Sequence, residues 1–138
     1  MISITKVVTF SASHRYWRSD WDEVRNRQTF GACSNPYGHG HNYRLEVTLR
    51  GPVDEETGMI VDLKQVKAAL EELVLGKLDH QYLNEAVPHF HTFLPTTENL
   101  VLYMRDLLRD AFPGIVLHRV RLWESDDLCA TWEEDPPC

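Results

Sequence analysis

The stretch Cys33-Ser34-Asn35-Pro36-Tyr37-Gly38-His39-Gly40-His41-Asn42-Tyr43 leads into the most regular strand pattern of the chain. From residue 42 to residue 50, apolar and polar side chains alternate, which is typical of a β-strand with one buried face. The apolar positions are Tyr43, Leu45, Val47 and Leu49. If the chain is also extended at His39 and His41, both imidazoles point to the same side.

Two histidines on one side of a strand are half of a metal site, because neutral imidazole is a common zinc ligand. Asn35-Pro36 favours a turn that brings Cys33 back toward them. Gly38 and Gly40 have no Cβ, so backbone or ligand can approach closely. A His-x-His pair also occurs by chance, and an isolated cysteine is more often an inert core residue. The site therefore needs a third ligand from elsewhere.

Upstream, residues 2–14 alternate well enough to predict a strand, with Lys6 as the exception on its apolar face. His14 ends that face, where it is either the third ligand or a core histidine. Residues 15–38 have no clean period and carry four arginines, which serve either an anionic group or a solvated loop surface.

Downstream, two helices are predicted. Asp62 caps the first, which runs to about Leu75 and is closed by Gly76. Pro95-Thr96-Thr97-Glu98-Asn99 begins the second, and Pro113-Gly114 ends it.

Two more strands follow, at residues 115–124 and 128–132. The first has Val116, His118, Val120, Leu122 and Glu124 on one parity. Glu124 at the end of this face either receives hydrogen bonds in a buried place or lies in water beyond the strand.

Between the two predicted helices, Asp79 stands beside His80. An aspartate in this position can orient or charge the imidazole.

The order strand, strand, helix, helix, strand, strand indicates an α+β fold with a four-stranded antiparallel sheet and two helices inserted between strand pairs. Four strands leave two edges, which suits pairing with neighbouring subunits.

The whole chain has the size and composition of one globular domain, residues 1–138. Its net charge of -7 argues against nucleic-acid and anionic-membrane partners. It has no apolar run of about 20 residues, the length of a membrane span, and no signal-peptide layout at its start. The three widely spaced cysteines, Cys33, Cys129 and Cys138, indicate reduced thiols and a cytoplasmic location.

Together these segments resemble the 6-pyruvoyl-tetrahydropterin synthase family, which includes 6-carboxytetrahydropterin synthase. The resemblance covers nearly the whole chain. It is carried by Phe10-Ser11-Ala12-Ser13-His14, residues 33–43, Thr57-Gly58-Met59, Leu78-Asp79-His80, Thr96-Thr97-Glu98-Asn99 and Trp123-Glu124-Ser125.

The resemblance implies a tunnelling fold (T-fold), in which trimers close a β-barrel and stack into homohexamers. It implies Zn2+ held by His14, His39 and His41, with active sites between subunits. The implied catalytic residues are Cys33 as base, with Asp79 and His80 completing the acid/base group. The implied pterin-binding residues are Glu124, as the anchor, with Thr96, Thr97 and Glu98 in the pocket.

The implied reaction is a zinc-dependent lyase step on a pterin triphosphate, 7,8-dihydroneopterin triphosphate, that yields 6-pyruvoyl-tetrahydropterin. Five residues separate Cys33 from His39, which resembles the pyruvoyl-forming type rather than the carboxy-forming enzymes of queuosine biosynthesis. The carboxy product and a non-catalytic pterin-binding protein stay as alternatives. A zinc hydrolase is disfavoured, because the chain has no His-Glu-x-x-His helix.

Overall fold

The computed structural model describes residues 1–136, and Cys138 lies outside them. The strands are β1 (Ile2–His14), β2 (His39–Gly51), β3 (Gln81–Tyr82), β4 (Val116–Ser125) and β5 (Leu128–Glu133). The α-helices are α1 (Glu23–Phe30), α2 (Leu63–Leu70), α3 (Gly76–Leu78), α4 (Leu83–Ala86) and α5 (Thr97–Leu108). A π-helix, Glu71–Leu75, joins α2 to α3, and 3-10 helices cover Gly31–Ser34 and Pro88–His91.

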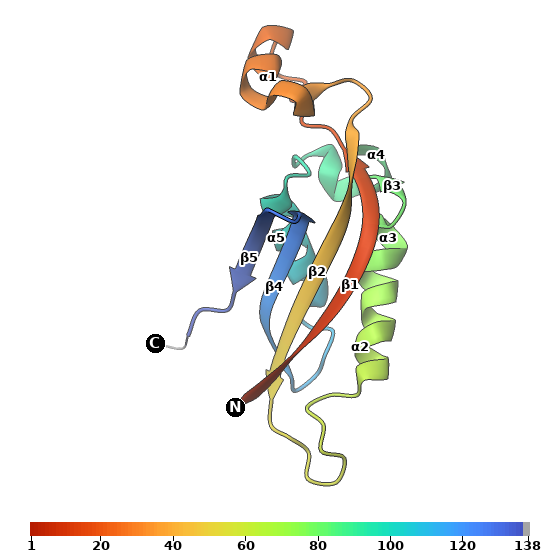
Figure 1. Ribbon diagram of the computed structural model, residues 1–138, viewed down its shortest axis with the longest axis vertical. Coiled ribbons are helices and arrows are strands. Elements are labelled where there is room, and N and C mark those ends of the chain that lie inside the picture. Colours follow the sequence, from red (N-terminus) through yellow and green to blue (C-terminus); the bar gives the residue numbers. More distant parts are fainter. Residues whose placement is uncertain (137–138) are drawn as a thin grey trace.

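The sheet has the order β3-β1-β2-β4-β5, and its four long strands are antiparallel, as predicted. Helices α2 and α5 lie on one side of this twisted sheet, whereas α1 projects from one end (Figure 1). The short strand β3 was not predicted, and it runs parallel to β1. His80, with φ 60, turns the chain there, and its amide donates to the Ser11 carbonyl at 2.6 Å.

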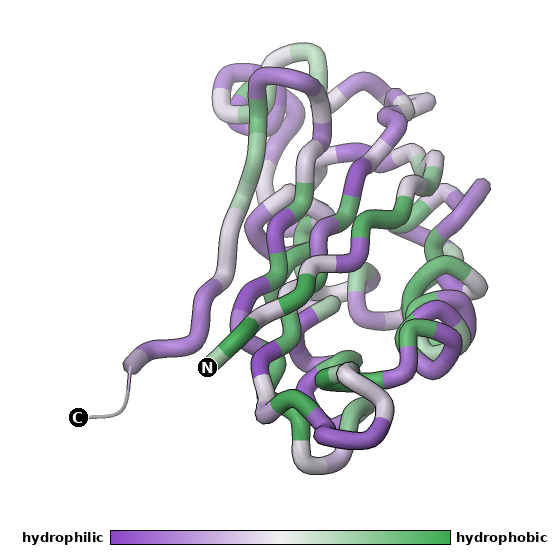
Figure 2. The backbone as a smooth tube through the Cα atoms, turned by 60° about the horizontal axis from the view of Figure 1, so that its bottom comes forward, coloured by the Kyte–Doolittle hydropathy of each residue, from purple (hydrophilic) through white to green (hydrophobic). Residues whose placement is uncertain are grey.

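The core lies between the sheet and the helices. Tyr43, Leu45 and Val47 are fully buried, as their alternation predicted, and apolar and polar segments alternate along the strands (Figure 2). Asp62 caps α2 and Thr96 caps α5, each by accepting a hydrogen bond from a backbone amide of its helix. Among residues 1–136, no helix is long and apolar enough to cross a membrane.

The helix after Asp62 does not end at Gly76. Gly76 has helical dihedral angles, with φ -62, and the chain continues as helix through Leu78. The π-turn explains why a glycine stands at this position. A Cβ at Gly76 would lie 2.9 Å from the Glu71 carbonyl oxygen. Gly76 therefore serves a close backbone approach instead of a helix end.

The predicted parity of residues 115–124 is wrong in its first half. The pairing of β2 with β4 shifts between Thr48 and Leu49, so Leu49 faces Leu117. This β-bulge turns Leu117 into the core and leaves Val116 exposed, whereas Val120 keeps the predicted inward direction.

The long segment before His39 is also more ordered than its pattern indicated. Asp22 caps α1, and the buried side chain of Asn26 hydrogen-bonds the backbone of Arg18 through both its oxygen and its nitrogen. Helix α1 has no apolar stripe, which explains why periodicity did not reveal it.

Candidate metal centre

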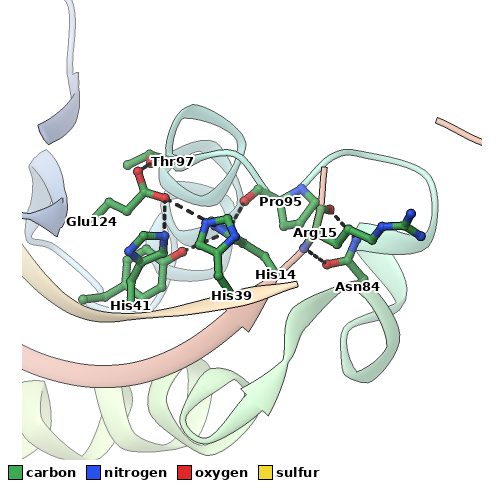
Figure 3. A network of polar contacts seen from close by, with 9 residues as sticks. His14, Arg15, His39, His41, Asn84, Pro95, Thr97 and Glu124 are labelled. Carbon is green, nitrogen blue, oxygen red and sulfur yellow. Dashed lines mark hydrogen bonds and ion pairs between the residues drawn. The ribbon is translucent and has the colours of Figure 1, made fainter. Parts of the chain in front are cut away.

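Three histidines meet where the two central strands end. His14 is the last residue of β1 and pairs with His39, the first residue of β2, while His41 lies opposite Ala12. The Nε2 atoms of His14 and His39 are 3.2 Å apart. All three imidazoles point into one small volume above the sheet (Figure 3).

Glu124 brings a carboxylate from β4 into the same volume. Its Oε1 lies 3.0 Å from His41 Nε2 and 3.4 Å from His14 Nε2, and the side chain is 10% exposed. Thr97 donates a hydrogen bond from Oγ1 to Glu124 Oε2 at 3.2 Å. Glu124 is therefore buried and hydrogen-bonded, and the alternative of a residue in water is wrong.

The arrangement of the imidazoles fits a metal ion. His14 Nδ1 lies 3.0 Å from the Pro95 carbonyl oxygen and donates its proton there, so Nε2 presents a lone pair to the centre. His41 Nε2 is buried without a hydrogen bond, although Glu124 Oε1 lies 3.0 Å away. Two nitrogens on a tetrahedral zinc ion are about 3.3 Å apart, similar to the His14–His39 separation.

Burial keeps the centre in the protonation state that metal binding needs. The pKa of His14 is lowered from 6.5 to about 4, chiefly by its burial and further by the neighbouring His39 and His41. The pKa of His41 is lowered by burial, although Glu124 opposes this shift. Neutral imidazoles and an ionised carboxylate are the ligand forms that bind a divalent cation.

Two residues support the position of His14: Tyr43, which was not predicted in this role, and Gly38, for which the sequence analysis predicted a close approach of backbone. The hydroxyl of Tyr43, which is fully buried, lies 3.1 Å from His14 Nδ1 and orients that ring together with Pro95. Gly38, with φ 66, passes so close to His14 that a Cβ would lie 2.6 Å from the His14 carbonyl oxygen. Tyr43 was read only as a core position, and a hydroxyl at the edge of a histidine cluster is the signal that was available.

Cys33 lies on the 3-10 helix Gly31–Ser34, which precedes β2. Its carbonyl oxygen accepts a hydrogen bond from the Tyr16 amide at 2.8 Å. The pKa of the Cys33 thiol is raised by burial and by the negative charge of Glu124. The pKa of Tyr16 is raised by burial, and further by the charges of Glu124, Cys33 and Glu98.

The ring of Tyr16 also packs against His14, with ring centroids 4.8 Å apart. Sequence reasoning missed Tyr16, because it lies in the segment without a clear period.

The first turn of α5 carries the residues predicted for the pterin pocket. Thr96 caps the helix, Thr97 is buried against Glu124, and Glu98 is exposed.

Among residues 1–136, Asp79 and His80 do not belong to the group of side chains whose ligand atoms cluster at this centre. Asp79 accepts a hydrogen bond from the Ser11 amide at 2.9 Å, and the His80 side chain is 83% exposed. His80 borders an open cavity of about 320 Å³, which is also lined by Ser11 and by His41 of the histidine cluster. Within residues 1–136, no hydrogen bond or ion pair joins Asp79 or His80 to Cys33.

The arginines of residues 15–27 are largely engaged already. Arg15 lies 4.1 Å from the centre of the Trp17 ring and donates to the Ser34 carbonyl oxygen. Arg18 forms an exposed ion pair with Asp20, as does Arg27 with Glu23. Arg15 and Arg18 border a cavity of about 550 Å³.

The fold and the site define an α+β protein in which three histidines and one carboxylate, a group that could hold a metal ion, cluster at the end of the sheet. The chain belongs to the 6-pyruvoyl tetrahydropterin synthase family, whose family model matches residues 3–135. This confirms the resemblance carried by the motifs.

Named relatives agree with this assignment. The 6-pyruvoyl tetrahydrobiopterin synthase of Poecilia reticulata is 42% identical over 123 residues, covering 89% of this chain and 84% of its own. That of Homo sapiens is 40% identical over 124 residues, covering 90% and 86%. The structure of Caenorhabditis elegans 6-pyruvoyl tetrahydropterin synthase matches with a TM-score of 0.90 at 35% identity, over 97% of this chain and 96% of that one.

Proposed function

We propose that this protein is a zinc-dependent lyase that converts 7,8-dihydroneopterin triphosphate to 6-pyruvoyl-tetrahydropterin with loss of triphosphate. One observation carries the proposal. In a chain of this family, three imidazole nitrogens and the carboxylate of Glu124 lie within 4.8 Å of one another.

In this proposal His14, His39 and His41 hold the zinc ion. Bound zinc supplies a Lewis acid that stabilises negative charge on a substrate hydroxyl oxygen and so acidifies the neighbouring C–H. The residues of the chain do the rest: Pro95 and Tyr43 fix the ring of His14, and Thr97 holds one oxygen of Glu124.

Cys33 is proposed to be the base that removes the substrate proton. Only a thiolate can do so, and burial and Glu124 both oppose its formation. A dication bound by His14, His39 and His41 would offset that negative charge and so favour the thiolate of Cys33. Cys33 is therefore expected to become active as a base only after metal has bound.

The pterin ring is proposed to bind at the first turn of α5, near Thr96, Thr97 and Glu98. A carboxylate that accepts two parallel N–H donors recognises the amino-pyrimidinone edge of a pterin. Glu124, the anchor that the resemblance implies, is already in contact with two histidines and Thr97, whereas Glu98 is exposed. Glu124→Gln should therefore weaken zinc and pterin binding together, and Glu98→Gln should weaken pterin binding alone.

Asp79 and His80 are proposed to relay protons at a cysteine of a neighbouring subunit, in a homohexamer built as a dimer of trimers. The exposure of His80 supports this assignment, as does the fact that within residues 1–136 no hydrogen bond or ion pair joins Asp79 or His80 to Cys33. We further propose a cytoplasmic location, which the free thiols of Cys33 and Cys129 support.

The test is incubation of the zinc-loaded protein with 7,8-dihydroneopterin triphosphate and identification of the products by mass spectrometry. Triphosphate with a 6-pyruvoyl product is the expected result. Acetaldehyde with 6-carboxytetrahydropterin would overturn the product assignment and indicate queuosine synthesis. Bound pterin without turnover would favour a binding protein.

A matched pair of variants tests the role of the thiol. Cys33→Ala should keep its zinc and lose turnover. Cys129→Ala removes a thiol on β5 and should keep both zinc and turnover. Loss of zinc from Cys33→Ala would make the thiol a metal ligand instead of a base.

A further inference from the structure

The side chain of Asn84 holds the backbone beside a candidate metal ligand. Its Oδ1 accepts a hydrogen bond from the Arg15 amide at 2.8 Å, and its Nδ2 donates to the Arg15 carbonyl oxygen at 2.7 Å. Arg15 directly follows His14, the last residue of β1 (Figure 3). One carboxamide thus holds both polar backbone groups of Arg15, and we call this pair of hydrogen bonds the Asn84 clamp.

The Asn84 clamp extends the pairing of β3 with β1. Ser13 lies opposite Tyr82, the last residue of β3, and the chain becomes helical at Leu83. A helical backbone no longer runs alongside a strand, so the ladder of backbone hydrogen bonds stops there. A carboxamide carries donors and an acceptor as a peptide unit does, so the side chain of Asn84 continues the pairing. It does so at the point where β1 itself ends.

Arg15 and Tyr16 carry this constraint to the segment of Cys33. Arg15 Nε donates to the carbonyl oxygen of Ser34, a fully buried residue, at 2.9 Å. The Tyr16 amide donates to the Cys33 carbonyl oxygen at 2.8 Å. The Arg15 guanidinium also lies 4.1 Å from the centre of the Trp17 ring, a cation–π contact that holds this side chain. Two consecutive residues after β1 therefore hold the 3-10 helix on which Cys33 lies.

We propose that Asn84 is a positioning residue that fixes His14 and Cys33 relative to each other. It acts through the backbone of residues 15 and 16, and within residues 1–136 both of its hydrogen bonds go to Arg15. This role rests on the proposed function, in which His14 binds zinc and Cys33 is the base. Loss of the Asn84 clamp should disturb the ligand geometry of the metal and the position of the base, while the groups proposed to bind the pterin stay in place.

The test uses the full-length protein with Co2+ in place of Zn2+, because the visible absorption bands of bound Co2+ report the geometry of its ligands. In Asn84→Ala these bands should shift. Zinc affinity, measured by chelator competition, should fall by about tenfold, the smallest loss typical of residues that orient metal ligands. The kcat should fall by about 10–100-fold with little change in KM, because a displaced base slows the chemical step and not substrate binding.

Asn26→Ala is the matched control, because Asn26 on α1 forms the same pair of hydrogen bonds elsewhere in the chain. Its Oδ1 accepts from the Arg18 amide at 2.8 Å, and its Nδ2 donates to the Arg18 carbonyl oxygen at 2.9 Å. Asn26 is fully buried, so Asn26→Ala should lower stability in urea unfolding at least as much as Asn84→Ala does. It should leave the Co2+ bands and zinc affinity unchanged.

Asn84→Asp separates the two hydrogen bonds of the Asn84 clamp. It keeps an oxygen that accepts from the Arg15 amide and loses the donor to the Arg15 carbonyl oxygen. Its zinc affinity should therefore lie between those of the wild type and Asn84→Ala. This variant also carries the test if Asn84→Ala does not fold, since its Co2+ bands should still shift.

Unchanged Co2+ bands and zinc affinity in Asn84→Ala, or in Asn84→Asp if only that variant folds, would overturn the proposal. An equal loss of zinc affinity in Asn26→Ala would overturn it too, because a general loss of stability would then explain the effect. A wild type that binds Co2+ but forms no 6-pyruvoyl product would refute only the proposed reaction, since the Co2+ bands and zinc affinity still decide the role of Asn84.

Discussion

At the scale of single residues, Gly38 shows how a missing side chain holds the metal centre together. Its φ of 66 favours glycine, and its Cα approaches the backbone of His14. Gly38→Ala should therefore destabilise the protein and lower its zinc affinity, because the new Cβ must push His14 away from His39. Zinc affinity by chelator competition and unfolding by urea measure the two effects.

The matched control is Gly58→Ala. Gly58 has a similar φ of 70, but a Cβ there would meet no atom within 4 Å. Its substitution should cost about 1–2 kcal/mol for the left-handed backbone alone and leave zinc affinity unchanged. Gly38→Ala should cost about 1–3 kcal/mol more, as overpacking does. Equal losses in the two variants would show that the contact with His14 carries no energy.

The residues of the metal centre could be predicted from the sequence only where they form part of a local motif. The pair His39 and His41 could be predicted as metal ligands because both lie on one side of a single strand. His14 could be predicted because it ends an alternating apolar pattern. Glu124 was left open on pattern alone, because its burial depends on the histidines and on Thr97, which are distant in sequence. Tyr16 was missed, because its position depends on the backbone of Cys33 and not on any local period.

At the scale of elements, the start of α5 supports the metal centre directly. The Pro95 carbonyl oxygen accepts from His14, and Thr97, in the first turn, donates to Glu124. Thr96 caps this helix. Thr96→Ala should therefore cost about 1 kcal/mol of stability, as lost caps do, and also lower zinc affinity.

Asp62→Ala provides the comparison, because Asp62 caps α2 far from the histidines. It should cost a similar free energy of unfolding and leave zinc affinity unchanged. Parallel measurement of both quantities in the two variants checks the prediction. If Thr96→Ala loses stability but binds zinc like the wild type, the helix start does not position the ligands.

The elements that sequence reasoning placed correctly are those with a clear period or a cap. The bulge in β4 was not predictable, because it arises from the pairing of β4 with β2. Neither strand has a sequence pattern that indicates it. The π-turn before Gly76 was missed for a related reason, since a glycine near the end of a periodic segment normally indicates a C-terminal cap.

At the scale of the whole molecule, the proposed sharing of active sites between subunits predicts complementation between variants. Cys33→Ala and His80→Ala should each lose turnover, since each breaks every active site. Mixed oligomers, reassembled from both variants after mild denaturation, contain some sites with an intact Cys33 from one chain and an intact His80 from its neighbour. Turnover should then return in part, and its continued absence would contradict shared sites.

The pH dependence of the metal-free protein is also a property of the whole molecule, because it couples the burial of one residue to global stability. The pKa of His14 is about 4 in the folded chain and 6.5 when solvated, so the unfolded state binds more protons between these values. The free energy of unfolding should therefore fall as the pH drops from 6.5 toward 4, by about 3 kcal/mol in total.

Urea unfolding of the metal-free protein at pH 7.5, 6 and 5 measures this slope, and His14→Gln is the control in which it should become shallower. Zinc requires the same neutral imidazoles, so zinc at about one hundred times its dissociation constant should add about 2.7 kcal/mol at pH 7.5 and progressively less on acidification. If the free energy of unfolding of the metal-free protein stays constant from pH 7.5 to 5, the pKa of His14 is the same in the folded and the unfolded state. Burial would then not be what keeps the centre ready for its metal.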